Sequence, residues 1–348
     1  GGLDIGAIMA GAKIVWANDK MKEANESYSL NIGNHIHYGD INDLIPSLAE
    51  LKGDIELVIG GPPCQGFSVA GKMKVDDERS QLVWSYVKVI ETLMPNAFIM
   101  ENVKALGVLE RWASVRTALL KRFTELGYSV NLCVLNASDF GVPQARERLF
   151  IIGFQNGKDA SPDLEIMLAK YKCKAPNVRE ALSVLDKAGT GNNQSICKAK
   201  ITLTANPVMR KSPYAGMLFN GLGRPMRIDG YSATLPASMG GNKTPIIDEK
   251  ALYENERPWV ESYHEKLMED ISNAKCAKVP SYLRRLTVDE ARIIQTFPLD
   301  YVFCGSQSSQ YTQIGNAVPC NLAKAVCSMV IDVLKGKTSI IYQASLFS

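Results

Sequence analysis

Short apolar runs alternate with helical patterns through the first half of the chain, and this alternation constrains the fold more than any other feature. Strands are expected at residues 13–17, 35–38, 55–59, 97–100, 129–135 and 149–154. Helices are expected at residues 3–10, 80–93 and 112–126. Strands that alternate with helices in this way form a mostly parallel sheet covered on both faces. The sequence therefore predicts an α/β fold.

Polar or nucleophilic residues follow four of these strands in succession. The four strand ends read Asn18-Asp19, Gly39-Asp40, Gly60-Gly61-Pro62-Pro63-Cys64 and Glu101-Asn102. Ligands bind at the carboxyl edge of an open α/β sheet, where such residues would gather. A single acidic residue after a strand is often only a helix cap. Four polar strand ends, one of them a Gly-Pro-Pro-Cys turn, indicate an active site.

The first twenty residues carry a pattern typical of nucleotide-like cofactors. Gly1-Gly2 open a glycine-rich turn into the helix expected at 3–10, and Asp19 lies 17 residues after Gly2. An acidic residue about 20 residues beyond such a turn commonly binds ribose hydroxyls. We therefore expect a cofactor with a nucleoside portion.

Composition narrows the class of protein further. At roughly 150 residues per domain, 348 residues suggest two domains. The chain has 39 Lys and Arg against 36 Asp and Glu, and this net charge of +3 excludes a histone-like binder or an acidic tail. The apolar runs are shorter than the roughly 18 residues that a membrane span requires. A globular protein without a membrane anchor is expected.

Eight cysteines are scattered along the chain without a C-x-x-C pair, and only three histidines accompany them. This spacing predicts neither a zinc site nor any other metal site. In a chain of this length a disulfide framework is not expected, and reduced thiols fit a cytoplasmic protein.

The composition changes after residue 154. Residues 1–154 are predicted to form one domain, whereas 155–280 are rich in Pro, Gly, Asn and Ser and indicate a smaller, loop-rich domain. Its loops contain basic residues among aromatic ones, namely Arg210, Lys211, Arg224, Arg227 and Lys243 with Tyr214, Phe219 and Tyr231. Such loops suit a nucleic-acid groove, although solvated surface loops are an alternative.

Six motifs resemble the signature blocks of DNA (cytosine-5) methyltransferases. They lie at residues 60–68 (Gly-Gly-Pro-Pro-Cys-Gln-Gly-Phe-Ser), 101–103 (Glu-Asn-Val), 144–148 (Gln-Ala-Arg-Glu-Arg), 285–287 (Arg-Leu-Thr), 295–298 (Gln-Thr-Phe-Pro) and 313–319 (Gln-Ile-Gly-Asn-Ala-Val-Pro). Their order and spacing match the family over nearly the whole chain. The Gln-Gly-Phe-Ser run looks like that of bacterial restriction–modification enzymes rather than that of their tRNA-methylating relatives.

The chemistry of cytosine methylation explains these residue types. C5 of cytosine is a poor nucleophile, so the ring must first be activated by addition at C6. Cys64 supplies a thiol for that addition, and Glu101 is placed to share or donate a proton at N3. Arg146 and Arg148, two residues apart, would point to one face of a strand and hold the base, a phosphate or Glu101. The resemblance implies the same role for Glu101.

The resemblance also implies a Rossmann-like fold that binds S-adenosylmethionine. Asp19 would bind the ribose hydroxyls, Asp40 and Ile41 the adenine, and Phe347 would stack on that ring. The implied cofactor residues are Gly1, Gly2, Asp19, Asp40, Ile41, Pro63, Leu82, Asn316 and Phe347.

The implied substrate is a cytosine flipped out of a short site in double-stranded DNA. Residues 155–280 correspond to the family's target-recognition domain, and 281–348 to a segment that returns to the catalytic domain. The implied substrate-binding residues are Gln65, Ser68, Asn102, Thr234, Gly240 and Gly241. A bacterial, nucleoid-associated monomer is expected, with a cognate restriction endonuclease as its functional partner.

The sequence departs from the family pattern at its beginning. The first block normally contains a strand and Phe-Ser before the glycines, yet the chain starts at Gly1 and residues 338–348 form an apolar run that contains Phe-Ser. One hypothesis is a circular permutation in which 338–348 supply the first strand of the sheet. A truncated N-terminus with an unrelated tail is the alternative. Cys320 replaces a second proline, with no mechanistic consequence expected.

Two other functions remain open from the sequence. A methyltransferase-like protein that binds DNA without catalysis would need no thiol at Cys64, and the set of Cys64, Glu101 and Arg146 argues against it. An enzyme that methylates RNA is the second alternative, and the recognition region of about 125 residues favours DNA instead.

Overall fold

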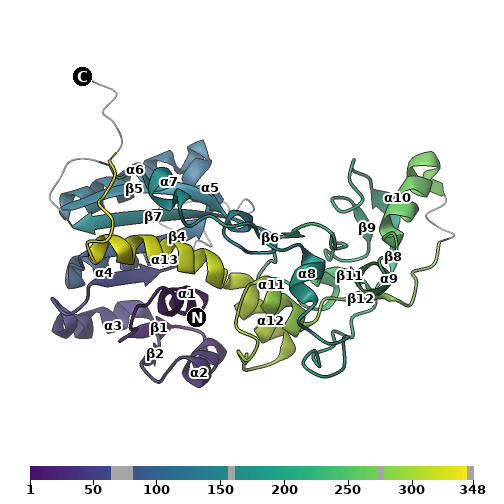
Figure 1. Ribbon diagram of the computed structural model, residues 1–348, viewed down its shortest axis with the longest axis horizontal. Coiled ribbons are helices and arrows are strands. Elements are labelled where there is room, and N and C mark those ends of the chain that lie inside the picture. Colours follow the sequence, from purple (N-terminus) through teal and green to yellow (C-terminus); the bar gives the residue numbers. More distant parts are fainter. Residues whose placement is uncertain (64–80, 156–160, 273–276, 343–348) are drawn as a thin grey trace. The chain divides into compact units, whose positions relative to one another are not determined.

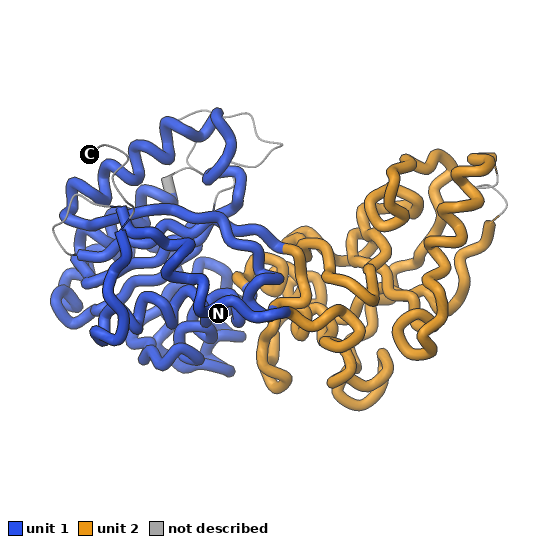
Figure 2. Tube along the Cα trace, turned by 45° about the horizontal axis from the view of Figure 1, so that its top comes forward, with its two compact units in different colours: residues 1–141, 146–174, 319–348 blue, residues 142–145, 175–318 orange. Residues whose placement is uncertain are grey.

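The computed structural model describes residues 1–63, 81–155, 161–272 and 277–342 (Figure 1). The chain divides into two compact units (Figure 2). Unit 1 comprises residues 1–141, 146–174 and 319–348, and unit 2 comprises residues 142–145 and 175–318. The division falls at residues 174 and 318 rather than at 154 and 280, the boundaries expected from composition.

Unit 1 contains a four-stranded sheet in the order β3-β4-β7-β5. Its strands are β3 (Leu57–Gly60), β4 (Ala97–Val103), β5 (Tyr128–Asn136) and β7 (Glu147–Gln155). β3 and β4 are parallel, whereas β7 is antiparallel to both of its neighbours, so β5 again runs parallel to β4. A separate parallel pair joins β1 (Ala17–Asp19) to β2 (Ile36–Tyr38). The predicted mostly parallel α/β fold is confirmed, with β7 as the reversed strand.

Helices connect and cover these strands. They are α1 (Gly2–Met9), α2 (Lys22–Asn31), α3 (Ile41–Leu48), α4 (Gln81–Leu93), α5 (Lys104–Val108), α6 (Ala113–Glu125), α7 (Leu164–Ala169) and α13 (Cys320–Leu334). Side chains of α4 and α6 pack with Phe98 and Met100 of β4 in one buried apolar cluster. Because side chains alternate along a strand, Ile99 and Glu101 face the other side of the sheet. On α13, which contacts β4 and α1, most residues are buried.

Two strands differ in extent from their sequence predictions. The strand expected at 13–17 is confined to Ala17–Asp19, because only these residues pair with β2. β4 continues three residues beyond Met100, because β7 pairs with it as far as Val103. As a result, Asp19 and Glu101 belong to the strands themselves rather than to the turns after them.

Residues 338–342 do not form the first strand of the sheet. After α13, Tyr342 forms a bridge with Pro162, and the Asp163 N–H donates to the Ile341 carbonyl at 2.6 Å. Pro162 in turn accepts a hydrogen bond from Asn131 of β5, so residues 341–342 lie near the β5 edge, away from β3. The permutation hypothesis is therefore wrong for residues 338–342. Residues 343–348, which include Phe347, lie outside the described residues.

Unit 2 is built from two-stranded ladders and long loops. Its strands are β6 (Gln144–Ala145), β8 (Leu203–Val208), β9 (Met217–Phe219), β10 (Ser232–Ala233), β11 (Ile246–Asp248) and β12 (Leu283–Arg285). β6 pairs with β10, β8 with β9, and β11 with β12. Its helices are α8 (Val178–Leu182), α9 (Glu249–Glu254), α10 (Trp259–Glu269), α11 (Val288–Ile294) and α12 (Gln307–Asn316).

One helical stretch among the described residues, 307–334, is long and apolar enough to cross a bilayer. It consists of α12 and α13, which are separated by extended backbone at Ala317 and by Pro319. Most of its apolar window is buried inside the protein, as expected for the core helix of a globular domain.

We expect Gly6→Ala in α1 to destabilise the protein, because a Cβ at this position would overlap the Cβ of Ala323 in α13. Overpacking typically costs about 1–3 kcal/mol, which exceeds the gain of about 1 kcal/mol in helix propensity. Urea unfolding would measure the difference. Ile8→Ala on the exposed side of the same helix is the control and should change stability by less than about 0.5 kcal/mol. Unchanged or increased stability in Gly6→Ala would show that α1 and α13 can separate.

Candidate active site

Glu101 and Arg148 form an ion pair across the antiparallel strands β4 and β7. Glu101 lies opposite Phe150 and Val103 lies opposite Arg148, so Glu101 and Arg148 are diagonal neighbours on the same face of the sheet. Arg148 Nε lies 3.0 Å from Glu101 Oε1, and the two side chains are only 15% and 12% exposed. The strand register therefore fixes the direction of the carboxyl group.

Burial and the two neighbouring arginines act in opposite directions on the pKa of Glu101, and the net effect is a rise. Burial raises the pKa of Glu101, and the charges of Arg148 and Arg146 oppose that rise. A carboxyl group with a raised pKa is protonated in a larger fraction of molecules near neutral pH than an ordinary glutamate. This group can therefore act as an acid toward a base placed beside it.

Arg146 lies between β6 and β7 rather than within a strand, and its side chain is buried. Its carbonyl accepts a hydrogen bond from the Ala137 N–H at 2.9 Å, which ties it to the end of β5. Burial lowers the pKa of Arg146, and the neighbouring charge of Arg148 lowers it further, whereas Glu101 raises it. The structure brings both arginines close to Glu101, although Arg146 lies outside the single strand that the i, i+2 prediction assumed.

The turn after β3 reaches the same place. The Asn102 side-chain amide donates to the Pro62 carbonyl at 3.1 Å, which anchors the turn to β4. A Cβ at Gly61 would lie 3.0 Å from Glu101 Oε2, so the carboxyl group lies directly against this main chain. At Gly60, a Cβ would lie 2.6 Å from the ring of Tyr86. Both glycines are therefore required by close packing.

Three of the predicted active-site residues, Cys64, Gln65 and Ser68, lie outside the described residues. The described chain ends one residue before Cys64, at Pro63, whose predecessor Pro62 is hydrogen-bonded to the strand that carries Glu101. The roles of these three residues stay predictions.

Two of the predicted cofactor residues lie together at the carboxyl ends of β1 and β2. The Gly39 N–H donates to the Asp19 carbonyl at 3.3 Å, and Asp40 follows directly. The exposed Asp19 accepts the Met21 N–H on Oδ1 at 2.8 Å. Asp40 caps α3 by accepting the Asn42 N–H at 3.0 Å, and this bond is the main cause of its lowered pKa. The sequence left open whether an acidic residue after a strand is only a helix cap. Asp40 does cap α3, and this role is independent of any ligand that its carboxylate binds.

The other predicted cofactor residues of unit 1 are distributed over nearby element ends. Gly1 and Gly2 begin α1, and the next residue, Leu3, has its Cδ1 3.9 Å from where a Cβ of Gly61 would lie. Ile41 is the first residue of α3. Leu82 is half-buried on α4, which is joined to α3 by a 2.7 Å hydrogen bond from Ser85 to Asn42. Pro63 is exposed. This edge of unit 1 offers acidic acceptors and main-chain donors suited to a nucleoside.

The remaining predicted site residues belong to unit 2. The Thr234 hydroxyl donates to the Ala145 carbonyl at 3.1 Å, and Asn316 is the last residue of α12. Gly240 and Gly241 adopt φ values of +135° and +54°, a region in which glycine is favoured.

Sequence reasoning missed the roles of Gln144 and Gln295, which are fully buried in unit 2. Gln144 Nε2 donates to Gln295 Oε1 at 2.8 Å, and Gln295 Nε2 donates to the carbonyls of Ile314 and Ala317. Gln144 Oε1 also accepts the Leu235 N–H at 3.1 Å. These bonds link three of the motifs and flank Asn316. The only signal in the sequence was the presence of glutamines within the motifs.

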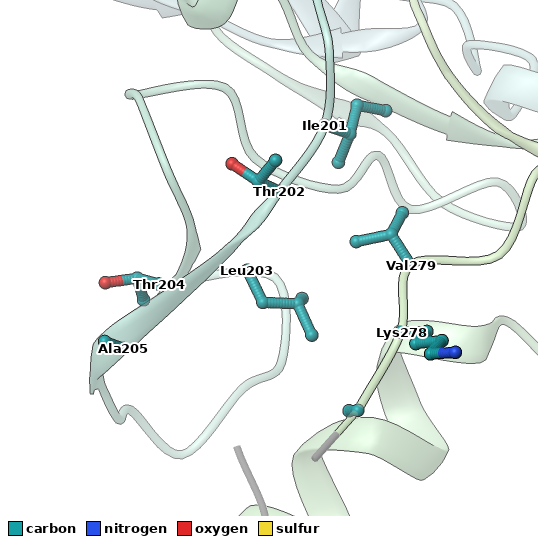
Figure 3. A pocket seen from close by; sticks show the side chains of 8 residues that line it. Ile201, Thr202, Leu203, Thr204, Ala205, Lys278 and Val279 are labelled. Carbon is teal, nitrogen blue, oxygen red and sulfur yellow. The ribbon is translucent and has the colours of Figure 1, made fainter. Parts of the chain in front are cut away.

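A cavity of about 480 Å³ in unit 2 is lined by none of the predicted site residues (Figure 3). Its lining consists of Ile201, Thr202, Leu203, Thr204, Ala205, Ala277, Lys278 and Val279. The described part of the chain also contains no group of three or more His, Cys, Asp or Glu that could hold a metal ion.

Comparisons with known proteins identify the family of the chain. A type II methyltransferase of Haemophilus parahaemolyticus, M1.HphI, is 32% identical over 80% of this chain and 69% of its own length. A second type II methyltransferase, M.MthTI of Methanothermobacter thermautotrophicus, is 31% identical over 97% of this chain and 96% of its own length. The solved structure of S. pombe Dnmt2 methyltransferase shares the fold, with a TM-score of 0.64 at 18% identity over 97% and 96% of the two chains. The family model for C-5 cytosine-specific DNA methylase matches residues 1–332, and the chain therefore belongs to this family.

Proposed function

We propose that this protein transfers a methyl group from S-adenosylmethionine to C5 of cytosine in a specific, short site of double-stranded DNA. The observation that carries the proposal is the buried Glu101 carboxyl, held by Arg148 against the turn that leads to Cys64. Enzymes of this family depend on S-adenosylmethionine in general. The acid, its cationic partners and the predicted nucleophile together form the set that this reaction requires.

The reaction begins at the cytosine ring. The Cys64 thiolate attacks C6, and the electron pair of the C5–C6 double bond moves through the ring toward N3. Glu101 in its protonated form, the fraction of which burial increases, donates its proton to N3. The charge that develops on the Glu101 carboxylate is then stabilised by Arg148 at 3.0 Å.

When bound, S-adenosylmethionine supplies an electrophilic methyl group to the activated C5. Loss of the C5 proton to a base and departure of the Cys64 sulfur then restore the aromatic ring. Glu101 takes back the proton from N3 in this last step, so the protein returns to its starting state.

The residues of unit 1 offer matching contacts for the cofactor. Asp19 is exposed and would accept hydrogen bonds from the ribose hydroxyls. Ile41 begins α3, so its N–H has no partner within that helix and is available to the adenine ring, beside Asp40. Gly1 and Gly2 at the start of α1 would face the polar end of the cofactor.

Unit 2 carries the features expected for target recognition. It holds Thr234, Gly240 and Gly241 and the exposed cations Arg210, Lys211 and Arg224. The names of the relatives place those proteins in type II restriction–modification. We infer the same setting here, with a monomeric enzyme acting on cytoplasmic DNA and a cognate endonuclease as functional partner.

The first test is transfer of labelled methyl groups from S-adenosylmethionine to unmethylated duplex DNA, followed by bisulfite sequencing. We expect label at C5 of one cytosine within one short motif, and a loss on the order of 10⁶-fold in Cys64→Ser, as for other removed nucleophiles. Cys173→Ser changes an exposed cysteine and should retain full activity. Duplex binding without any transfer would favour a binding protein, and label in tRNA alone would favour an RNA methyltransferase.

The pH dependence of the reaction tests Glu101. The acid must be protonated, so the wild-type rate should fall as the pH rises through the raised pKa of Glu101. Glu101→Gln should lose about 10²- to 10⁴-fold in kcat, together with this alkaline decline. The pH profile of kcat from single-turnover measurements gives both quantities. Glu147→Gln, an exposed glutamate paired with Lys104, should keep the wild-type profile, and an unchanged profile in Glu101→Gln would contradict the acid role.

Binding of S-adenosylmethionine, measured by calorimetry, tests Asp19 without reference to activity. Asp19→Asn keeps an oxygen for the Met21 N–H but removes the negative charge and one acceptor. Charge-assisted hydrogen bonds of this kind contribute about 1.5–3 kcal/mol, so Kd should rise by about 10- to 150-fold. Asp43→Asn on the exposed surface of α3 is the control. Equal affinities of Asp19→Asn and wild type would place the ribose elsewhere.

A further inference from the structure

A buried asparagine on α2 connects this helix to the end of β1. Asn25 is only 8% exposed, and its side-chain amide donates to the carbonyls of Asp19 at 2.8 Å and Met21 at 2.9 Å. Asp19 is the last residue of β1, and Met21 directly precedes α2, which lies beside the pair of β1 and β2 (Figure 1). A single amide group thus holds the turn between the strand and the helix, residues 19–21.

The two carbonyls of this turn fix the orientation of the Asn25 amide. Because both carbonyls are acceptors, the nitrogen of the amide must face them and its oxygen must point elsewhere. The Oδ1 atom is buried and has no hydrogen-bond partner in the part of the chain that the structure describes. A buried oxygen without a donor lowers the stability of the folded protein. The side chain is therefore placed for its contacts with the turn, and this placement is unfavourable for its own oxygen.

Both carbonyls keep a partner without the Asn25 side chain. The Asp19 carbonyl also accepts the Gly39 N–H at 3.3 Å, and the Met21 carbonyl also accepts the main-chain N–H of Asn25 at 3.1 Å. Truncation of the side chain would therefore leave no carbonyl unpaired and would remove the unpaired oxygen. Asparagine is also a weaker helix former than alanine. The contribution of this amide to the stability of the fold is therefore small.

The turn that Asn25 holds determines where the Asp19 carboxylate points. The Met21 N–H donates to Asp19 Oδ1 at 2.8 Å and so fixes the side chain against the start of α2. The position of that N–H depends on the main chain of residues 19–21, which the Asn25 amide contacts at both ends. Asp19 is exposed, and its Oδ2 forms no hydrogen bond or ion pair with the residues that the structure describes. The turn therefore presents one free carboxylate oxygen to solvent.

A ribose ligand requires this carboxylate to be placed accurately. The ribose of a nucleoside presents two adjacent hydroxyl groups as donors, and a residue that binds them must stay within about 0.5 Å of the productive geometry. An exposed aspartate on an unsupported turn would have to be ordered when the ligand binds, and this ordering would reduce the affinity. Hydrogen bonds that already exist in the unliganded protein avoid that loss.

We propose that Asn25 is a positioning residue of the cofactor site, which holds the turn 19–21 so that Asp19 meets the ribose hydroxyls of S-adenosylmethionine. The proposal rests on the methyltransferase function and on the Asp19 contact proposed above, and it adds the residue that prepares this contact. Asn25 acts through Asp19 and does not touch the cofactor itself.

The test measures the Kd of S-adenosylmethionine by calorimetry together with the melting temperature. Asn25→Ala should raise Kd by about 2- to 10-fold, because the hydrogen bonds that order the turn are lost. Its melting temperature should stay within about 2 °C of the wild-type value. Methylation kinetics should show a raised KM for S-adenosylmethionine with an unchanged kcat, because the reacting groups are not altered.

A double-mutant cycle separates positioning of Asp19 from a general effect on α2. In the Asp19→Asn background, Asn25→Ala should change Kd by less than about 2-fold, since the carboxylate that it positions is already gone. Asn31→Ala is the matched control, because the Asn31 amide on the same helix donates to the Ser27 carbonyl at 2.5 Å, a bond that lies within α2. This control should bind S-adenosylmethionine like wild type.

Several outcomes would overturn the proposal while leaving the methyltransferase function intact. They are a wild-type Kd in Asn25→Ala, an equal loss of affinity in both backgrounds, and an equal loss in Asn31→Ala. Full affinity in Asp19→Asn would overturn the ribose contact and the role of Asn25 together. A wild-type protein that binds no S-adenosylmethionine would overturn the proposed function as well.

Discussion

The buried ion pair between Glu101 and Arg148 is the interaction on which the rest of the site depends. A carboxyl group at this depth needs a cationic partner in good geometry, because an unpaired buried charge is strongly unfavourable. That partner can reach it only because β7 runs antiparallel to β4 and brings Arg148 diagonally opposite. The reversed strand therefore fixes the position of the Glu101 carboxyl as well as completing the sheet.

The same pair explains why the preceding turn contains so many small or rigid residues. Gly61 leaves space for the Glu101 carboxyl, Gly60 leaves space for Tyr86, and Asn102 holds the Pro62 carbonyl. These contacts bind β3 to β4 at the point where the chain approaches Cys64. The two strand ends thus behave as one structural unit, in which a change to either alters the environment of the acid.

Much of this arrangement could be predicted from the sequence, because it follows from local patterns. Strand and helix periodicity predicted the α/β fold and the strands that carry Glu101 and precede Asp40, and the Gln-Ala-Arg-Glu-Arg motif singled out Arg146 and Arg148. The sequence could not show that Glu101 lies inside a strand or that β7 is reversed, since both depend on pairing between distant segments. The misplacement of residues 338–342 has a similar cause, because an apolar run does not specify which neighbour it will pair with.

The hydrogen bonds of Gln144 and Gln295 have a consequence for how freely the sequence between the two glutamines can change. Both glutamines lie outside residues 155–280, and their partner among the described residues of that range is the main-chain N–H of Leu235, which any residue except proline possesses. A substitution at this position other than proline therefore keeps the donor of the hydrogen bond. The two glutamines thus hold the segment without requiring a particular side chain from it.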